Sequence, residues 1–96
     1  MGRDVVRGLV MCHGDAVAVL MGEVRAGEEV ALVDTNQQAL GTVVARDRVD
    51  AFHKLAVRHI DAEGSITKAG SVIGKASQAI APGSHVHVHN LTSARV

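Results

Sequence analysis

Short apolar runs alternate along the chain with turn-forming residues, and no apolar run is long. Runs of this kind, rich in β-branched residues and bounded by Gly, Asp or Asn, favour strands over helices. The run over 16–21 could also form a short buried helix, but its length and its bounding turns favour a buried strand. The pattern predicts strands over 4–12, 16–21, 30–33, 41–45 and 51–60, around Ile66 and Val72–Ile73, and over 83–90.

A seven-residue unit recurs, in which two aliphatic residues flank an Ala or Pro that lies next to Gly. It occupies 24–30 and 80–86, and a looser copy with its Gly one place late occupies 60–66. Each copy is typical of strand–turn–strand, because Gly adopts the positive φ that such a turn needs. The spacing of the copies is irregular, which argues against a solenoid. We expect a mainly β fold of short strands and long hairpins, with little helix.

Composition narrows the possible functions. The 96 residues form one domain, 1–96, with one Phe and no Tyr or Trp. Ten basic and ten acidic residues give no net charge, which removes the electrostatic argument for nucleic acid or an anionic membrane surface. The lack of aromatic residues also removes a platform for stacking single-stranded bases. We expect neither nucleic acid nor a membrane as a partner.

The remaining composition favours a cytoplasmic protein. Cys12 is the only cysteine, so no internal disulfide can form, and its apolar surroundings suggest a small buried hydrophobic residue. No apolar run approaches the roughly 20 residues that a membrane span needs. The start of the sequence lacks the apolar region of a signal peptide.

Histidine alternates with valine close to the C-terminus. On a strand, His85, His87 and His89 would share one face, and Val86 and Val88 the other. Three imidazoles are unsuited to a core because each buried ring needs polar partners. The alternative is the solvent face of a half-exposed strand. Because three histidines occur together, we favour a functional site lined by these imidazoles over a solvent-exposed face.

The predicted strand over 51–60 and the end of the histidine segment add polar candidates. Alternation puts Lys54 and Arg58 on one face, where they could bind a carboxylate, or simply face solvent. The same alternation puts His53 and His59 at the two ends of the opposite face. Asn90 could donate a hydrogen bond to a substrate, or end the strand as a turn residue.

These segments together resemble a known family, the SAF-type β-clip domain of altronate and galactarate dehydratases. Its pattern is roughly GHKVAL-x-x-I, then Lys-x-Gly, then IG-x-A, and finally G-x-x-VH-x-HN. The resemblance covers most of the chain and is weak over 34–50. It is carried by His53–Ile60, Ile66–Gly70, Val72–Gly74 and Gly83–Asn90.

Two residues depart from the family pattern. Phe52 stands where the family has Gly before His-Lys, and Ala69 stands where an aromatic residue is common. Phe adopts positive φ only at a cost. We therefore expect the turn that leads into His53 to differ from the family's turn.

The resemblance implies hydro-lyase chemistry on a small sugar acid such as altronate or galactarate. It also implies a divalent metal, Fe²⁺, held mainly by a partner chain. The domain would be the small subunit, or the N-terminal domain, of an enzyme whose larger catalytic chain completes the active site. Elimination of water needs a base, an acid and a group that stabilises the enediolate. We assign His87 and His89 to acid–base work or metal ligation.

We assign substrate binding to Asn90, Lys54, Arg58 and His85. Too few acid–base and metal groups are present for a complete site, so we expect no turnover by this chain alone. The chain's last residues resemble the tail of stand-alone small subunits, with a cut domain as the alternative.

Three other functions remain open: the small subunit of a sulfolactate sulfo-lyase, a non-catalytic carbohydrate-binding SAF module, and a lone metal-binding protein. Self-association into a homo-oligomer is also open.

Overall fold

The computed structural model describes residues 5–87 and 89–93, and all their regular structure is β. Within those ranges there is no helix that could span a membrane. The expectation of a mainly β fold of short strands is confirmed. The strands are β1 (Val6–Leu9), β2 (Val17–Leu20), β3 (Glu29–Val33), β4 (Ala39–Val44), β5 (Lys54–Ala56), β6 (Ser65–Lys68), β7 (Ser71–Ala76), β8 (His85–Val86) and β9 (Leu91–Ser93).

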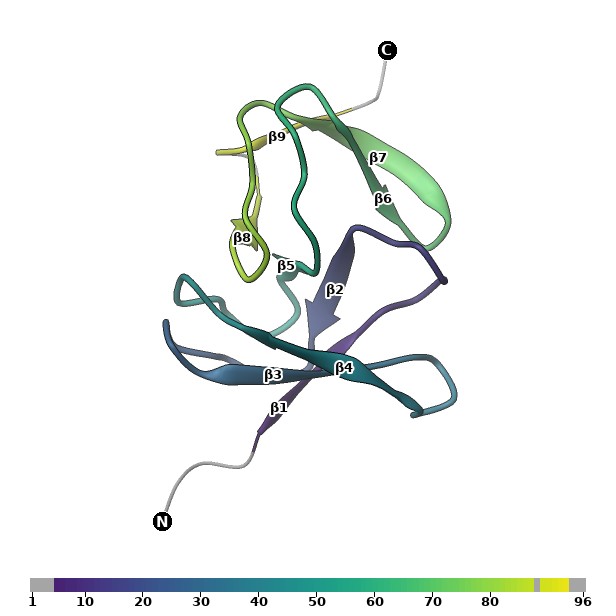
Figure 1. Ribbon diagram of the computed structural model, residues 1–96, viewed down its shortest axis with the longest axis vertical. Coiled ribbons are helices and arrows are strands. Elements are labelled where there is room, and N and C mark those ends of the chain that lie inside the picture. Colours follow the sequence, from purple (N-terminus) through teal and green to yellow (C-terminus); the bar gives the residue numbers. More distant parts are fainter. Residues whose placement is uncertain (1–4, 88, 94–96) are drawn as a thin grey trace.

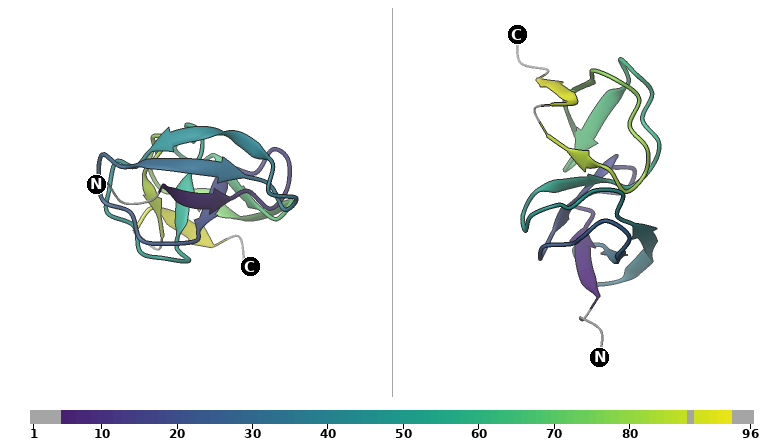
Figure 2. Two further views of the ribbon diagram at one scale, coloured as in Figure 1. Left: turned by 90° about the horizontal axis from the view of Figure 1, so that it is seen from below. Right: turned by 90° about the vertical axis from the view of Figure 1, so that its left-hand side faces the viewer.

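The strands form two sheets. Six strands pair in the order β4-β3-β1-β2-β5-β8, and three pair in the order β6-β7-β9. β1 and β3 run parallel, and the other paired strands run antiparallel. Strands β1, β3 and β4 lie toward the N-terminal end, and the smaller sheet lies toward the C-terminal end (Figure 1). The views in Figure 2 show the same arrangement from below and from the side.

Two apolar clusters stabilise the fold, and β2 and β5 supply residues to both. Successive side chains of a strand face opposite sides of its sheet. Ala18 and Leu55 therefore join one cluster, and their neighbours Val17 and Ala56 join the other. The first cluster contains Val10, Ala18, Leu20, Val24, Val30, Leu32, Ala45, Val49 and Leu55. The second contains Ala16, Val17, Ala56, Ile60, Ile66, Ala76, Ile80 and Val86.

The seven-residue unit forms the same turn at each copy. The fifth residue donates its N–H to the carbonyl of the second, and the fourth has positive φ. The first and last residues are buried. The first residues also pair with one another as isolated bridges, Val24 with Val49 and Ile60 with Ile80. These turns occupy 24–30, 49–55, 60–66 and 80–86.

The copy over 49–55 was missed in the sequence because Phe52 occupies its glycine position. The φ of Phe52 is 68°, beside 92° at Gly27 and 89° at Gly83. His53 donates its N–H to the Asp50 carbonyl at 3.2 Å, which closes the turn. The expectation that Phe52 would avoid a positive φ is therefore wrong: the backbone forms the same turn as at Gly27 and Gly83, and Phe52 takes the unfavourable φ.

Three of the predicted strands are too long. The run over 4–12 forms only the four-residue β1. The run over 51–60 forms only the three-residue β5, after which Val57 donates its N–H to Ala16 outside the strand pairing. The run over 83–90 forms only the two-residue β8. Hydrogen bonding with neighbours decides where a strand ends, and alternation alone does not show it.

The predicted burial of Cys12 is also wrong, because this residue is exposed. Cys12 opens a turn in which Asp15 donates its N–H back to the Cys12 carbonyl at 3.1 Å. The buried residue of this turn is Asp15, at 4% exposure.

Candidate functional site

Three histidines meet at one edge of the six-stranded sheet: His85 opens β8, His87 follows β8, and His53 directly precedes β5. In the β5–β8 pairing, Leu55 lies opposite His85, and Lys54 lies opposite Val86. One further step in this register places His53 opposite His87. Directly opposed residues share a face in an antiparallel pair. We call His53, His85 and His87 the histidine cluster.

The rings of the histidine cluster are in contact. Nδ1 of His53 lies 3.0 Å from Nε2 of His85, a hydrogen bond in which one ring donates and the other accepts. The rings of His85 and His87 are stacked, with centroids 5.3 Å apart and planes 10° apart. The ring of His53 lies 5.2 Å from that of His87. His53 and His85 are half-buried and His87 is exposed, so the cluster is open to solvent on one side.

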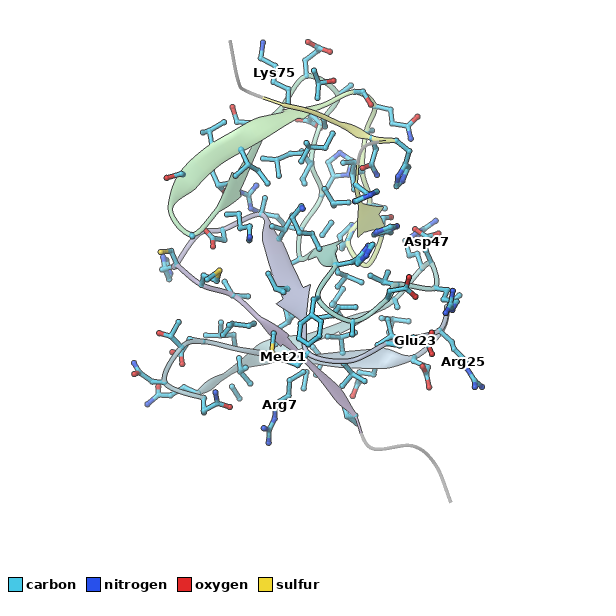
Figure 3. All side chains as sticks on the ribbon, turned by 180° about the vertical axis from the view of Figure 1, so that it is seen from behind. Arg7, Met21, Glu23, Arg25, Asp47 and Lys75 are labelled. Atoms are coloured by element: carbon cyan, nitrogen blue, oxygen red, sulfur yellow. The ribbon has the colours of Figure 1, made fainter. Side chains whose placement is uncertain are left out.

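The environment keeps His85 neutral. Burial lowers the pKa of His85, and the positive charges that His53, His87 and His89 can carry lower it further. Asp47 opposes this shift, and its carboxylate accepts the backbone N–H of His85 at 3.0 Å. Figure 3 shows Asp47 on the side of the molecule where β8 lies. Since an unperturbed histidine has a pKa near 6.5, His85 is mainly neutral at neutral pH, and one of its two ring nitrogens then carries a lone pair.

Asn90 holds the segment that presents His85 and His87. Its side-chain oxygen accepts the His87 N–H at 3.0 Å, and its amide nitrogen donates to the His85 carbonyl at 2.8 Å. Asn90 and Leu91 also donate their backbone N–H groups to the His87 carbonyl. Asn90 is 3% exposed. Its amide is therefore engaged with the backbone, where it shapes the turn.

This turn changes the position of the third predicted histidine. His89 does not continue a strand from His87, because the chain bends after β8. The ring of His89 still lies 5.5 Å from that of His85, tilted by 45°. His89 is thus a neighbour of the histidine cluster, outside the group whose ring nitrogens converge. Val88, which was predicted to face away from the imidazoles, lies outside the described residues.

The two predicted cations do not join the cluster. Lys54 is the first residue of β5 and lies opposite Val86, not opposite a histidine of the cluster. Strand β5 ends at Ala56, so alternation does not carry Arg58 onto the face of Lys54. The Arg58 guanidinium donates to the Gly14 carbonyl at 3.2 Å.

His53 was not assigned to the site from the sequence, although two signals pointed to it. It occupies the His-Lys position of the family pattern, and it follows the turn of a seven-residue unit. Placing it in the cluster requires the pairing of β5 with β8, and the two histidines that this brings together, His53 and His85, are 32 residues apart.

The histidine cluster fits a divalent metal ion. Each ring offers one nitrogen, and these nitrogens lie within 4.8 Å of one another. Imidazole nitrogens bind zinc at about 2.1 Å and also suit iron, copper and nickel. Two such ligands around a tetrahedral ion would lie about 3.4 Å apart, close to the 3.0 Å between Nδ1 of His53 and Nε2 of His85. Three protein ligands leave a position open, as in catalytic metal sites.

A family model identifies the domain. Residues 6–94 match the model of the altronate/galactarate dehydratase SAF domain. The match extends over nearly the whole chain and includes every residue of the histidine cluster.

Individual relatives agree with this match. Subunit alpha of the (2R)-sulfolactate sulfo-lyase of Chromohalobacter salexigens is 34% identical over 82 residues, which cover 84% of this chain and 87% of the relative. The altronate dehydratase of Bacillus subtilis is 35% identical over 77 residues, and that of Escherichia coli is 40% identical over 76. These stretches cover 79% of this chain but 14% of each dehydratase. The chain therefore corresponds to almost all of the sulfo-lyase subunit and to a small part of each dehydratase.

The fold, the paired histidine strands and these matches lead to one conclusion: the chain belongs to the SAF-domain family of altronate and galactarate dehydratases.

Proposed function

We propose that this domain works with a larger catalytic chain in a lyase that eliminates a small group from a hydroxy acid. Its contribution is the histidine cluster, presented at the open edge of β5 and β8. The observation that supports this most directly is the convergence of three imidazoles in a member of this family. The domain would act as a small subunit or as the first domain of a longer chain.

In this proposal His85 takes the proton next to the substrate carboxylate. Its lowered pKa leaves it neutral at the working pH, which a general base requires. The proton can be shared with His53 across their 3.0 Å hydrogen bond. His87, stacked on His85 and open to solvent, is positioned to face the leaving group. The substrate carboxylate binds the larger chain, because Lys54 lies opposite Val86 and not opposite a histidine of the cluster.

We further propose that the cluster supplies ligands to a divalent metal, with Fe²⁺ the expected ion, and that the larger chain supplies the rest. When bound, such an ion polarises the substrate carboxylate and stabilises the enediolate. Imidazoles that ligate the ion are not free as bases, so base and ligand roles must be divided among His53, His85, His87 and His89.

The fraction of each relative that this chain matches supports sulfite as a second candidate leaving group. The chain matches 87% of a sulfo-lyase subunit, against 14% of each dehydratase. Release of sulfite from sulfolactate is therefore the variant to test beside loss of water from altronate or galactarate. Sulfite leaves as a stable anion and needs less help from an acid than hydroxide does.

The proposal is tested by mixing the purified chain with the larger lyase chain of the same organism. We expect turnover of a sugar acid or of sulfolactate only when both chains are present. His85→Gln should lower kcat at least 100-fold, about the usual effect of a lost general base. His59→Ala is the matched control, because His59 is exposed and pairs with Asp61.

Three results would contradict the proposal. Turnover by the 96-residue chain alone would show a complete site within it. No turnover of the three substrates by the mixture would exclude the reaction. Equal activity of His85→Gln and His59→Ala would show that the histidine cluster takes no part in the reaction.

The metal proposal has a test that does not depend on activity. At pH 7.5 the chain should bind one Co²⁺ or Zn²⁺ ion, measured by calorimetry and by the visible absorption of Co²⁺. His53→Ala should weaken binding at least tenfold because a nitrogen ligand is lost, and His59→Ala should leave it unchanged. Equal affinity of these two variants would place the ion elsewhere.

A further inference from the structure

Phe52 combines a strained backbone with an exposed apolar side chain. Its φ of 68° lies in the left-handed region, which costs an L-residue free energy because Cβ crowds the backbone. The side chain is 72% exposed, the highest value among the exposed large apolar residues of the described chain. Glycine occupies the same turn position at Gly27 and Gly83. Neither property of Phe52 stabilises the isolated domain.

Glu63 provides a comparison within the same molecule. It occupies the same turn position with a φ of 66° and is also exposed. The charged side chain of Glu63 is well solvated, so only its backbone conformation costs free energy. Phe52 also leaves an aromatic ring in water. Residues held in such strained conformations cluster at functional sites.

Phe52 adjoins the histidine cluster along the chain and is held by backbone hydrogen bonds. It directly precedes His53, whose ring contacts His85. Phe52 donates its N–H to the Leu20 carbonyl at 2.7 Å, and Leu20 donates back to the His53 carbonyl at 3.0 Å. These bonds fix Phe52 at the end of β2. Met21, the residue after Leu20, is 45% exposed and lies just beyond the end of β2 (Figure 3). Two exposed apolar residues, Phe52 and Met21, thus lie at this end of β2, an apolar corner from which the chain continues directly into His53 of the cluster.

The relatives indicate what covers this corner. The matching region is 14% of each altronate dehydratase, and the sulfo-lyase relative is named a subunit. Phe52 is the chain neighbour of His53, so it is within reach of a chain that covers the histidine cluster. We infer that Phe52 is an anchor for the larger lyase chain, its ring filling an apolar pocket on that chain beside the shared active site. This inference rests on the proposed function.

The test compares Phe52→Gly with Glu63→Gly. Both changes remove the same backbone strain, so both should raise Tm, by about 4–8 °C in a domain of this size. Only Phe52→Gly should weaken binding to the purified larger lyase chain of the same organism, by at least tenfold in Kd measured by calorimetry. Phe52→Leu should recover part of that affinity, because an apolar side chain again fills the pocket.

The outcomes separate this inference from the proposed function. If the wild-type chain and the larger chain do not bind, both are overturned. If they bind and Phe52→Gly binds within threefold of wild type, the anchor alone is overturned. A lower Tm for Phe52→Gly would also overturn it, since the ring would then stabilise the domain itself.

Discussion

Replacing Gly83 with alanine should destabilise the protein by about 2–5 kcal/mol, the sum of a left-handed backbone penalty and overpacking. Gly83 has a φ of 89°, and a Cβ built on it would lie 2.0 Å from the Val44 carbonyl oxygen. That oxygen belongs to the backbone and cannot turn aside. The Gly83 carbonyl also accepts the Arg46 N–H, and its N–H donates to the Ala56 carbonyl, each at 2.8 Å. Any shift that relieves the clash must break these bonds.

Gly27→Ala is the control for this prediction. Gly27 occupies the same turn position with a φ of 92°, but a Cβ there would meet no atom within 4 Å. This variant should lose only the backbone penalty, about 1–2 kcal/mol. The free energy of unfolding from urea titration measures both variants. Equal losses would show that the approach of Gly83 to Val44 does not constrain the fold.

Asp15→Ala should destabilise the protein by about 3 kcal/mol or more, because hydrogen bonds to a charged group contribute about 1.5–3 kcal/mol each and are not additive. The Asp15 carboxylate accepts three backbone N–H groups: Cys12 at 3.1 Å, Ala69 at 2.7 Å and Gly70 at 3.0 Å. It thereby joins the turn before β2 to the turn between β6 and β7. Removing it leaves these donors without their acceptor.

Asp34→Ala provides the contrast. The Asp34 carboxylate accepts the N–H groups of Asn36 and Gln38, but it serves an exposed local turn where water can replace it. The free energy of unfolding of Asp34→Ala should fall by only about 1 kcal/mol, the usual net value for exposed hydrogen bonds. Denaturation curves for both variants test the prediction. If Asp15→Ala lost no more than Asp34→Ala, Asp15 would not be the link between the two turns.

Local features of the sequence were sufficient for the fold class. Valine-rich runs bounded by glycine predicted short strands, and the unit around Gly27 and Gly83 predicted a turn that the structure repeats. The same local evidence was misleading at Phe52, because side-chain identity predicts a preference for φ and not the φ that the surrounding bonds impose. It was also misleading at Cys12, where an apolar neighbourhood in sequence did not mean a buried position.

The candidate site was only half visible in the sequence. Alternation placed His85 and His87 on one face, and the structure stacks their rings. The third ring of the cluster belongs to His53, which was not assigned to the site from the sequence. Asn90 was assigned to substrate binding, but its side chain holds the backbone of the turn. Lys54 and Arg58 are separated because β5 stops at Ala56.

The sequence by itself therefore determined the kind of structure and the residues with chemistry to offer: β-strands, glycine turns, and imidazoles near the C-terminus. Only the tertiary structure decided where each strand ends and which imidazoles meet. The physical reason is that a strand's register and limits are set by hydrogen bonds to partners far along the chain. His53 and His85 are 32 residues apart, and Asp15 reaches a turn 54 residues away.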